Sequence, residues 1–269
     1  TAAEVELAAA VRQTLLSTVL SIVDSAAAVA NSSNVTTDDG TGSGAGGDGT
    51  AGDLILKRPS IATQNETVAE EAITNVAAIV AEPEQNTVIA QDLASAFLDR
   101  ELGALAQQSA AEGNTTSNVS ALASPLSDTT LDSAASATSA LIESVYQAAM
   151  STSSNGSVTD ALAAKIGARL SSGASALSIV QLRGKDIGDP PVTRKQPRLT
   201  VMSQRHSSAA FCGGDSNEGS AAAPGTTLLT SGSVSFSLPP LRSSGVECDS
   251  EAATDTAMVV WELSPWSFE

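Results

Sequence analysis

The chain has 269 residues with 30 acidic and 13 basic side chains, which give a formal net charge of −17 at pH 7. A charge this negative argues against binding a nucleic-acid backbone, which requires clustered cations. The length is enough for one or two domains with a buried core. Five of the seven aromatic residues follow residue 210, so we expect two differently built halves.

The chain begins at Thr1 rather than at a methionine, so we expect it to belong to a longer protein. A signal peptide would then lie upstream. The most apolar stretch, residues 15–30, includes serines and Asp24 and therefore predicts a water-soluble helix. We expect any membrane anchor to lie outside these residues.

Five stretches carry apolar residues at helical spacing, which predicts a small helical bundle. They begin near Thr1, at Thr67, at Asn86 or Thr87, at Leu131, and at Thr159 or Asp160. The first two open on the capping boxes 1–4 and 67–70. Pro83 is expected to end the second helix, and the fifth is expected to end near Gly173.

The first two helices are separated by an insert at residues 31–62, which contains a glycine-rich tract at 38–53. The tract has one imperfect copy of a glycine-rich calcium-binding pattern, Gly46-Gly-Asp-Gly49. Its composition is also that of a flexible linker, and we favour a flexible, glycosylated insert.

After residue 174 the period changes from helical to alternating, which predicts strands. The expected strands are residues 177–183, 199–202, 226–230, 233–238 and 257–263. Short strands joined by Gly, Ser and Pro suggest a β-sandwich. The predicted fold is therefore α+β, with an α-helical subdomain at 1–173 followed by a β-sandwich subdomain at 174–269.

Charge is unevenly distributed along the chain. Residues 1–164 carry 20 acidic and 4 basic side chains, whereas residues 165–205 carry 8 Lys and Arg against 2 acids. The basic stretch has two interpretations, a local patch for an anion or partner and a solvated linker.

Six of the nine asparagines lie in Asn-X-Ser/Thr sequons. They are Asn31, Asn34, Asn65, Asn114, Asn118 and Asn155. Each lies in a predicted loop or at a helix start, where a solvated glycan is tolerated. Ser/Thr-rich linkers also produce sequons by chance, but chance placement accounts for only about two of them.

The two cysteines, Cys212 and Cys248, both lie in the second half. They form no CxxC pair and have no group of histidines nearby, so no metal site is predicted. An even pair in an extracellular chain favours a disulfide. It would close a loop of about 37 residues, worth about 4 kcal/mol in the chain-entropy model. The alternative is two buried free thiols in an intracellular protein.

No catalytic motif was found. The one histidine, His206, follows a predicted strand in a polar run and is interpreted as a surface residue. No Gly-X-Ser-X-Gly elbow, phosphate loop or dinucleotide fingerprint occurs. The acid pairs 70–71 and 99/101 are expected to be solvated charges on helix surfaces. We therefore expect no enzymatic activity and no cofactor.

Three segments of the second half resemble the GAIN-type region of polycystin-1-like and egg-jelly-receptor (REJ) proteins. Pro197–Met202 is similar to an early strand of that region, Ser233–Pro239 to its strand ending in Leu-Pro, and Met258–Phe268 to a later strand followed by a turn. The helical half resembles the family in layout. The family's autoproteolysis motif, ending in His-Leu-Ser/Thr, is absent from these residues, so no cleavage role is assigned.

The resemblance implies a non-catalytic extracellular glycoprotein module next to the membrane, on the plasma or ciliary membrane or in a secreted matrix. Such a module would act as a scaffold for adhesion, mechanosensing or assembly with a channel partner. Its partners would be extracellular or membrane proteins, such as a polycystin-type channel subunit, and not nucleic acid. The alternative is a structural glycoprotein of an extracellular fibre, cell wall or ciliary appendage.

Overall fold

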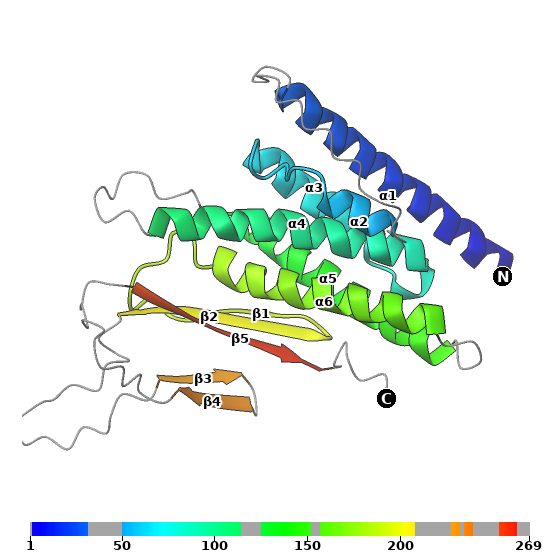
Figure 1. Cartoon of the computed structure of the whole chain (residues 1–269). Helices are drawn as coiled ribbons and strands as arrows, with labels where there is room; N and C mark the ends of the chain where they lie inside the picture. The colour runs from blue at the N-terminus through cyan, green and yellow to red at the C-terminus, as the bar shows by residue number, and fades with distance from the viewer. Residues whose placement is uncertain are drawn as a thin grey trace, which may run out of the picture.

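The computed structural model describes residues 2–31, 50–113, 125–151, 157–207, 227–231, 234–238 and 253–262. The helices come first: α1 (Ala2–Asn31), α2 (Ala51–Leu56), α3 (Glu66–Val80), the 3-10 helix η1 (Pro83–Gln85), α4 (Val88–Gly113), α5 (Asp128–Ser151) and α6 (Ser157–Val180). The strands follow: β1 (Val192–Lys195), β2 (Leu199–Ser207), β3 (Thr227–Ser231), β4 (Val234–Leu238) and β5 (Ala253–Trp261). This order confirms the predicted α+β class (Figure 1).

Helices α4 and α6 form the centre of the bundle and pack directly on each other. Their largest fully buried side chains are Phe97, Leu98, Leu102, Leu105, Ile166, Leu170 and Leu177. Small residues bring the two backbones close together, since a Cβ built on Gly173 would lie 3.9 Å from the Cα of Asp99. The alanine-rich composition therefore supports close helix packing.

The prediction that α6 ends near Gly173 and that residues 177–183 form a strand was wrong. The helix continues to Val180 and so crosses the predicted boundary between residues 173 and 174. Leu177, Ile179 and Gln181 are two residues apart and would lie on one face of a strand, which is why the segment was predicted as a strand. Burial instead follows a helical period, with Ala174, Leu177 and Val180 inside and Ile179 exposed.

The helix starts show which capping residues are used. Of the two predicted candidates, Asn86 and Thr87, it is Thr87 that caps α4, because its Oγ1 accepts a hydrogen bond from the Ala90 backbone N–H at 3.2 Å. The predicted start at Thr67 was wrong. Helix α3 begins at Glu66, and the Asn65 side chain is the cap, accepting from the Val68 N–H at 3.2 Å.

Part of the predicted flexible insert at 31–62 is packed structure. Residues 51–56 form α2, which lies against α4. Ile55, Ile61 and Ala62 are buried in the same hydrophobic core as the bundle. The second half of the insert is therefore part of the helical block, and residues 32–49 lie outside the described residues.

The antiparallel sheet β1–β2–β5 covers one side of the bundle (Figure 1). Strand β2 is central, with Leu199 paired to Trp261 of β5 and Lys195 of β1 paired to Thr200. Leu199 and Val201 are fully buried and belong to the core that the helices form. The helices and this sheet thus share one core.

Strands β3 and β4 form a separate two-stranded ribbon, which is also antiparallel. Figure 1 shows it on the side of the three-stranded sheet away from the helices. Four of the five predicted strands correspond to β2, β3, β4 and β5, whereas the short strand β1 was not predicted.

Candidate functional site

The basic stretch at 165–205 runs from α6 through β2. It lies at the interface between the helices and the sheet, which we call the joint. Its five arginines are all ion-paired. Arg169, Arg183, Arg194, Arg198 and Arg205 pair respectively with Asp53 and Asp92, Glu66, Asp128 and Asp132, Glu143, and Asp255. The stretch is therefore not a linker, and these five arginines are not a free cationic patch. They balance the acidic charge of the other elements.

Arg194 and Arg198 tie the sheet to α5. Arg194 Nη2 lies 2.6 Å from Asp128 Oδ1, and its Nη1 pairs with Asp132. Arg198 pairs with Glu143, which lies about three turns beyond Asp132 on α5. The hydrogen bond from Arg194 holds the pKa of Asp128 below its usual value. Because Asp128 and Asp132 are largely exposed, the two pairs of Arg194 contribute more to orientation than to stability.

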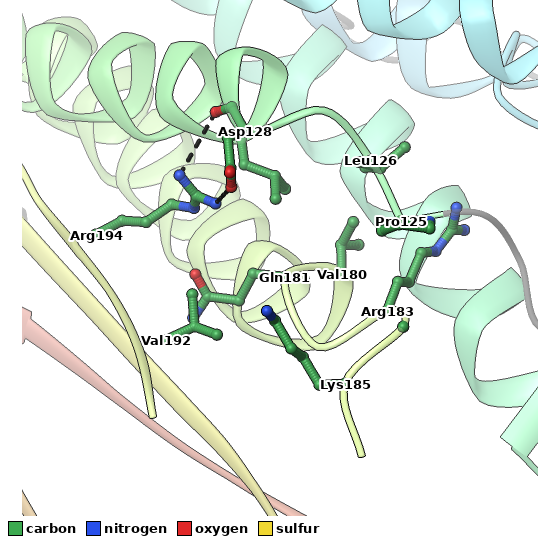
Figure 2. Close-up of a pocket in the computed structure, with 11 residues that line it drawn as sticks. Pro125, Leu126, Asp128, Val180, Gln181, Arg183, Lys185, Val192 and Arg194 are labelled. Atoms are coloured by element: carbon green, nitrogen blue, oxygen red, sulfur yellow. Dashed lines mark hydrogen bonds and ion pairs between the residues drawn. The ribbon is translucent and has the colours of Figure 1, made fainter. Parts of the chain in front are cut away.

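A cavity of about 310 Å³ lies within this joint (Figure 2). Its walls come from the start of α5, the end of α6 with the loop after it, and β1. Two buried polar atoms on the wall, Gln181 Oε1 and Arg194 Nε, have no hydrogen-bond partner in the described part of the chain. Gln181 is positioned by its Nε2, which donates to Ser203 Oγ at 2.6 Å.

The cavity combines unsatisfied polar atoms with a cation, Lys185, whose side chain extends toward Gln181 in Figure 2. Such a lining suits a small polar or anionic group. It holds no nucleophile paired with a general base among its described residues, because the lining is otherwise aliphatic or carries ion-paired arginine and aspartate.

A buried ion cluster fixes α2 against the centre of the bundle. Asp92 accepts hydrogen bonds from the Gly52 backbone N–H at 2.7 Å and from Arg169 Nη1 at 2.6 Å. Arg169 Nη2 also reaches Asp53 at 2.8 Å, and Lys165 pairs with the same carboxylate. A hydrogen bond from Lys165 is the main cause that lowers the pKa of Asp53 to about 2, outweighing the opposing effect of burial.

A second buried cluster surrounds Glu101 and corrects its interpretation as a solvated surface charge. Glu101 is fully buried, and its Oε2 accepts from Ser60 Oγ at 2.6 Å and from the Ala62 N–H at 2.9 Å. Its Oε1 pairs with Arg100 Nε at 2.6 Å, and Arg100 Nη1 donates to the Ile55 carbonyl. The cluster therefore holds residues 55–62 against α4.

Glu70 is also more than a solvated charge. Its Oε2 accepts from Thr130 Oγ1 at 2.9 Å and from the Ser127 backbone N–H at 3.3 Å. A carboxylate from α3 thus lies at the N-terminus of α5, where negative charge stabilises a helix.

His206 lies near the end of β2, with its Nε2 3.0 Å from Thr256 Oγ1 on β5. Burial lowers the pKa of the imidazole, against the opposing charge of Asp255.

In the described ranges, no group of three or more His, Cys, Asp or Glu side chains is placed to hold a metal ion. None of the helices described is long and apolar enough to cross a bilayer.

The predicted glycosylation and disulfide sites are mostly beyond what the structure describes. Cys212, Cys248, Asn34, Asn114, Asn118 and Asn155 lie outside the described residues. Asn31 ends α1, and its side chain is not described. Asn65 is exposed at the start of α3.

Sequence reasoning missed the ion-paired role of the arginines, although one signal was present. A strongly acidic helical region followed by a basic stretch has complementary charge, which allows pairing within the chain.

In comparisons with known proteins, no family model, curated protein or solved structure matches the chain.

Proposed function

We propose that the chain is a non-catalytic extracellular scaffold, the GAIN-like juxtamembrane module of a polycystin-1/REJ-like surface glycoprotein. The observation that carries the proposal is the joint between helices and sheet. Leu199 and Val201 of β2 enter the helical core, while Arg194 and Arg198 pair with α5. A module built in this way passes load from one half to the other as a single body.

The proposal includes a β-sandwich in the second half, with Cys212 and Cys248 joined in a disulfide. The two antiparallel sheets support it, since β3 contacts β2 and the β3–β4 ribbon lies on the side of the three-stranded sheet away from the helices. A disulfide between the two cysteines would link the segments of the chain that precede β3 and β5. Such bracing suits a module that carries load outside the cell.

The first expected result is that helices and sheet unfold together. Trp261 lies in β5 and packs against the shared core. In a Trp266→Phe variant it is the one remaining tryptophan, so its fluorescence reports on the sheet. Far-ultraviolet circular dichroism reports mainly on the helices. In urea, the two signals should give coincident transitions. A fluorescence transition at clearly lower urea than the helical one would contradict a single load-bearing body.

The extracellular part of the proposal predicts a glycan on Asn65. Its Oδ1 caps α3 through Val68, whereas a glycan attaches through Nδ2, so cap and glycan are compatible. When the chain is secreted from eukaryotic cells, peptide mass spectrometry should find Asn65 modified. It should also find Cys212 linked to Cys248.

The matched variants are Thr67→Ala and Asn65→Gln. Thr67→Ala removes the sequon but retains the Asn65 cap, so it should abolish the glycan and leave helix stability nearly unchanged. Asn65→Gln removes both and should cost about 1 kcal/mol more. Unmodified Asn65 together with two free thiols in the secreted protein would refute the extracellular assignment.

A further inference from the structure

Helix α1 has apolar residues on two faces, and the bundle covers one of them. Leu16 and Leu20 are buried against the bundle. On the other face, Leu7, Val11 and Leu15 are 67%, 49% and 50% exposed. Figure 1 shows α1 as the outermost helix, along one side of the bundle. Three large apolar side chains, each one helical turn apart, therefore form an exposed stripe.

The polar groups on this face are satisfied within the helix itself. Thr14 Oγ1 donates to the Ala10 carbonyl at 2.9 Å, and Thr18 Oγ1 donates to the Thr14 carbonyl at 2.8 Å. Ser17 Oγ donates to the Gln13 carbonyl at 2.9 Å. The face can lose water without leaving these hydroxyl donors unsatisfied, which removes the usual cost of burying polar groups.

The exposed face is also uncharged, although the whole chain carries a net charge of −17. Arg12 is the one charged residue between residues 7 and 21. It is half-buried, and its Nη1 donates to the Ile79 carbonyl at 2.9 Å, back toward the bundle. Another acidic protein surface would therefore meet no like charge on this face.

We propose that this face binds a second copy of the chain, with the two α1 helices packed antiparallel. Leu7, Val11, Thr14 and Thr18 follow the alternating four- and three-residue spacing of a coiled-coil seam. An antiparallel pair centred between residues 12 and 13 places Leu7 opposite Thr18 and Val11 opposite Thr14 of the second copy.

Leu15 lies beside this seam, and within the seam each large apolar side chain of one copy faces a threonine of the other. This self-complementarity is what a two-fold interface requires, and it favours a second copy over an unrelated helix. The seam is only about 20 Å long, so the interface is small. Both copies are strongly acidic, and we expect a dissociation constant of about tens of micromolar.

Sedimentation equilibrium of the full chain tests the proposal. The expected result is a monomer–dimer equilibrium that Leu7→Lys weakens at least about tenfold, because two charges would be buried in the seam. Met150→Lys is the matched control. Met150 is as exposed as Leu7, at 67%, but lies on α5, so its substitution should leave the equilibrium unchanged. Circular dichroism of both variants should match that of the parent chain.

Salt provides a second readout. Raising the ionic strength from about 0.02 M to 0.3 M should strengthen the dimer, since screening weakens the repulsion between two acidic copies. A dimer held by ion pairs elsewhere would weaken instead. A chain that stays monomeric at several hundred micromolar, or a dimer equally weakened by both lysine variants, would overturn the proposal.

Discussion

Replacing Gly52 by alanine is expected to destabilise the folded chain by about 3 kcal/mol. A Cβ at this position would lie 2.4 Å from Arg169 Nη1 and 2.8 Å from the Asp92 backbone oxygen. Neither group can move easily, because Arg169 is buried and the carbonyl belongs to α4. Helix propensity alone predicts the opposite sign, since alanine is the better helix former. Urea unfolding of the two proteins measures the difference.

Gly103→Ala is the control, because it makes the same change in a helix with open space. Nothing lies within 4 Å of a Cβ built on Gly103. This variant should stabilise the chain by about 0.5–1 kcal/mol. If Gly52→Ala were as stabilising as Gly103→Ala, the close approach of α2 to Asp92 and Arg169 would be wrong.

Arg169→Met is expected to cost about 3–5 kcal/mol. The guanidinium is the buried partner of Asp92, and both side chains are almost inaccessible to solvent. Removing it leaves a carboxylate charge buried with only weaker donors. Adding Asp92→Asn to this variant should recover part of the loss, because the uncompensated charge is then gone. Chemical denaturation of the single and double variants checks both expectations.

The matched variant for this prediction is Arg205→Met. Arg205 pairs with Asp255 through two hydrogen bonds at 2.8 and 3.0 Å, but both side chains are partly exposed. Water and salt screen such a pair, so its loss should cost only about 0–1 kcal/mol. An Arg169→Met cost no larger than that of Arg205→Met would show that the Asp92 cluster is not buried as described.

The five long helices could be predicted because each one is encoded locally, whereas α2 was not predicted. The apolar period across residues 88–113 and the cap at Thr87 located α4 without any knowledge of its neighbours. The end of α6 could not be located in this way. Leu177 and Val180 fit both a strand and a helix, and contact with α4 decided between them.

Which charged side chains are buried could not be predicted from the local sequence either. Glu101 and Asp99 have equally ordinary sequence surroundings, yet Glu101 is fully buried with three hydrogen-bonding partners. Asp99 is only partly covered, and burial raises its pKa. Which acid is buried depends on where residues 55–62 pass over α4, and no local pattern specifies that path.

The sequence by itself determined the α+β class, the order of helices before strands and the charge asymmetry between residues 1–164 and 165–205. Those properties follow from periodicity, capping and composition, which act within a few residues. Only the tertiary structure decided that Arg169 meets Asp53 across 116 residues and that Arg194 meets Asp128 across 66. Pairing between residues so far apart in the sequence depends on the path of the whole chain, because a buried charge pairs with an opposite charge that the packed helices place next to it.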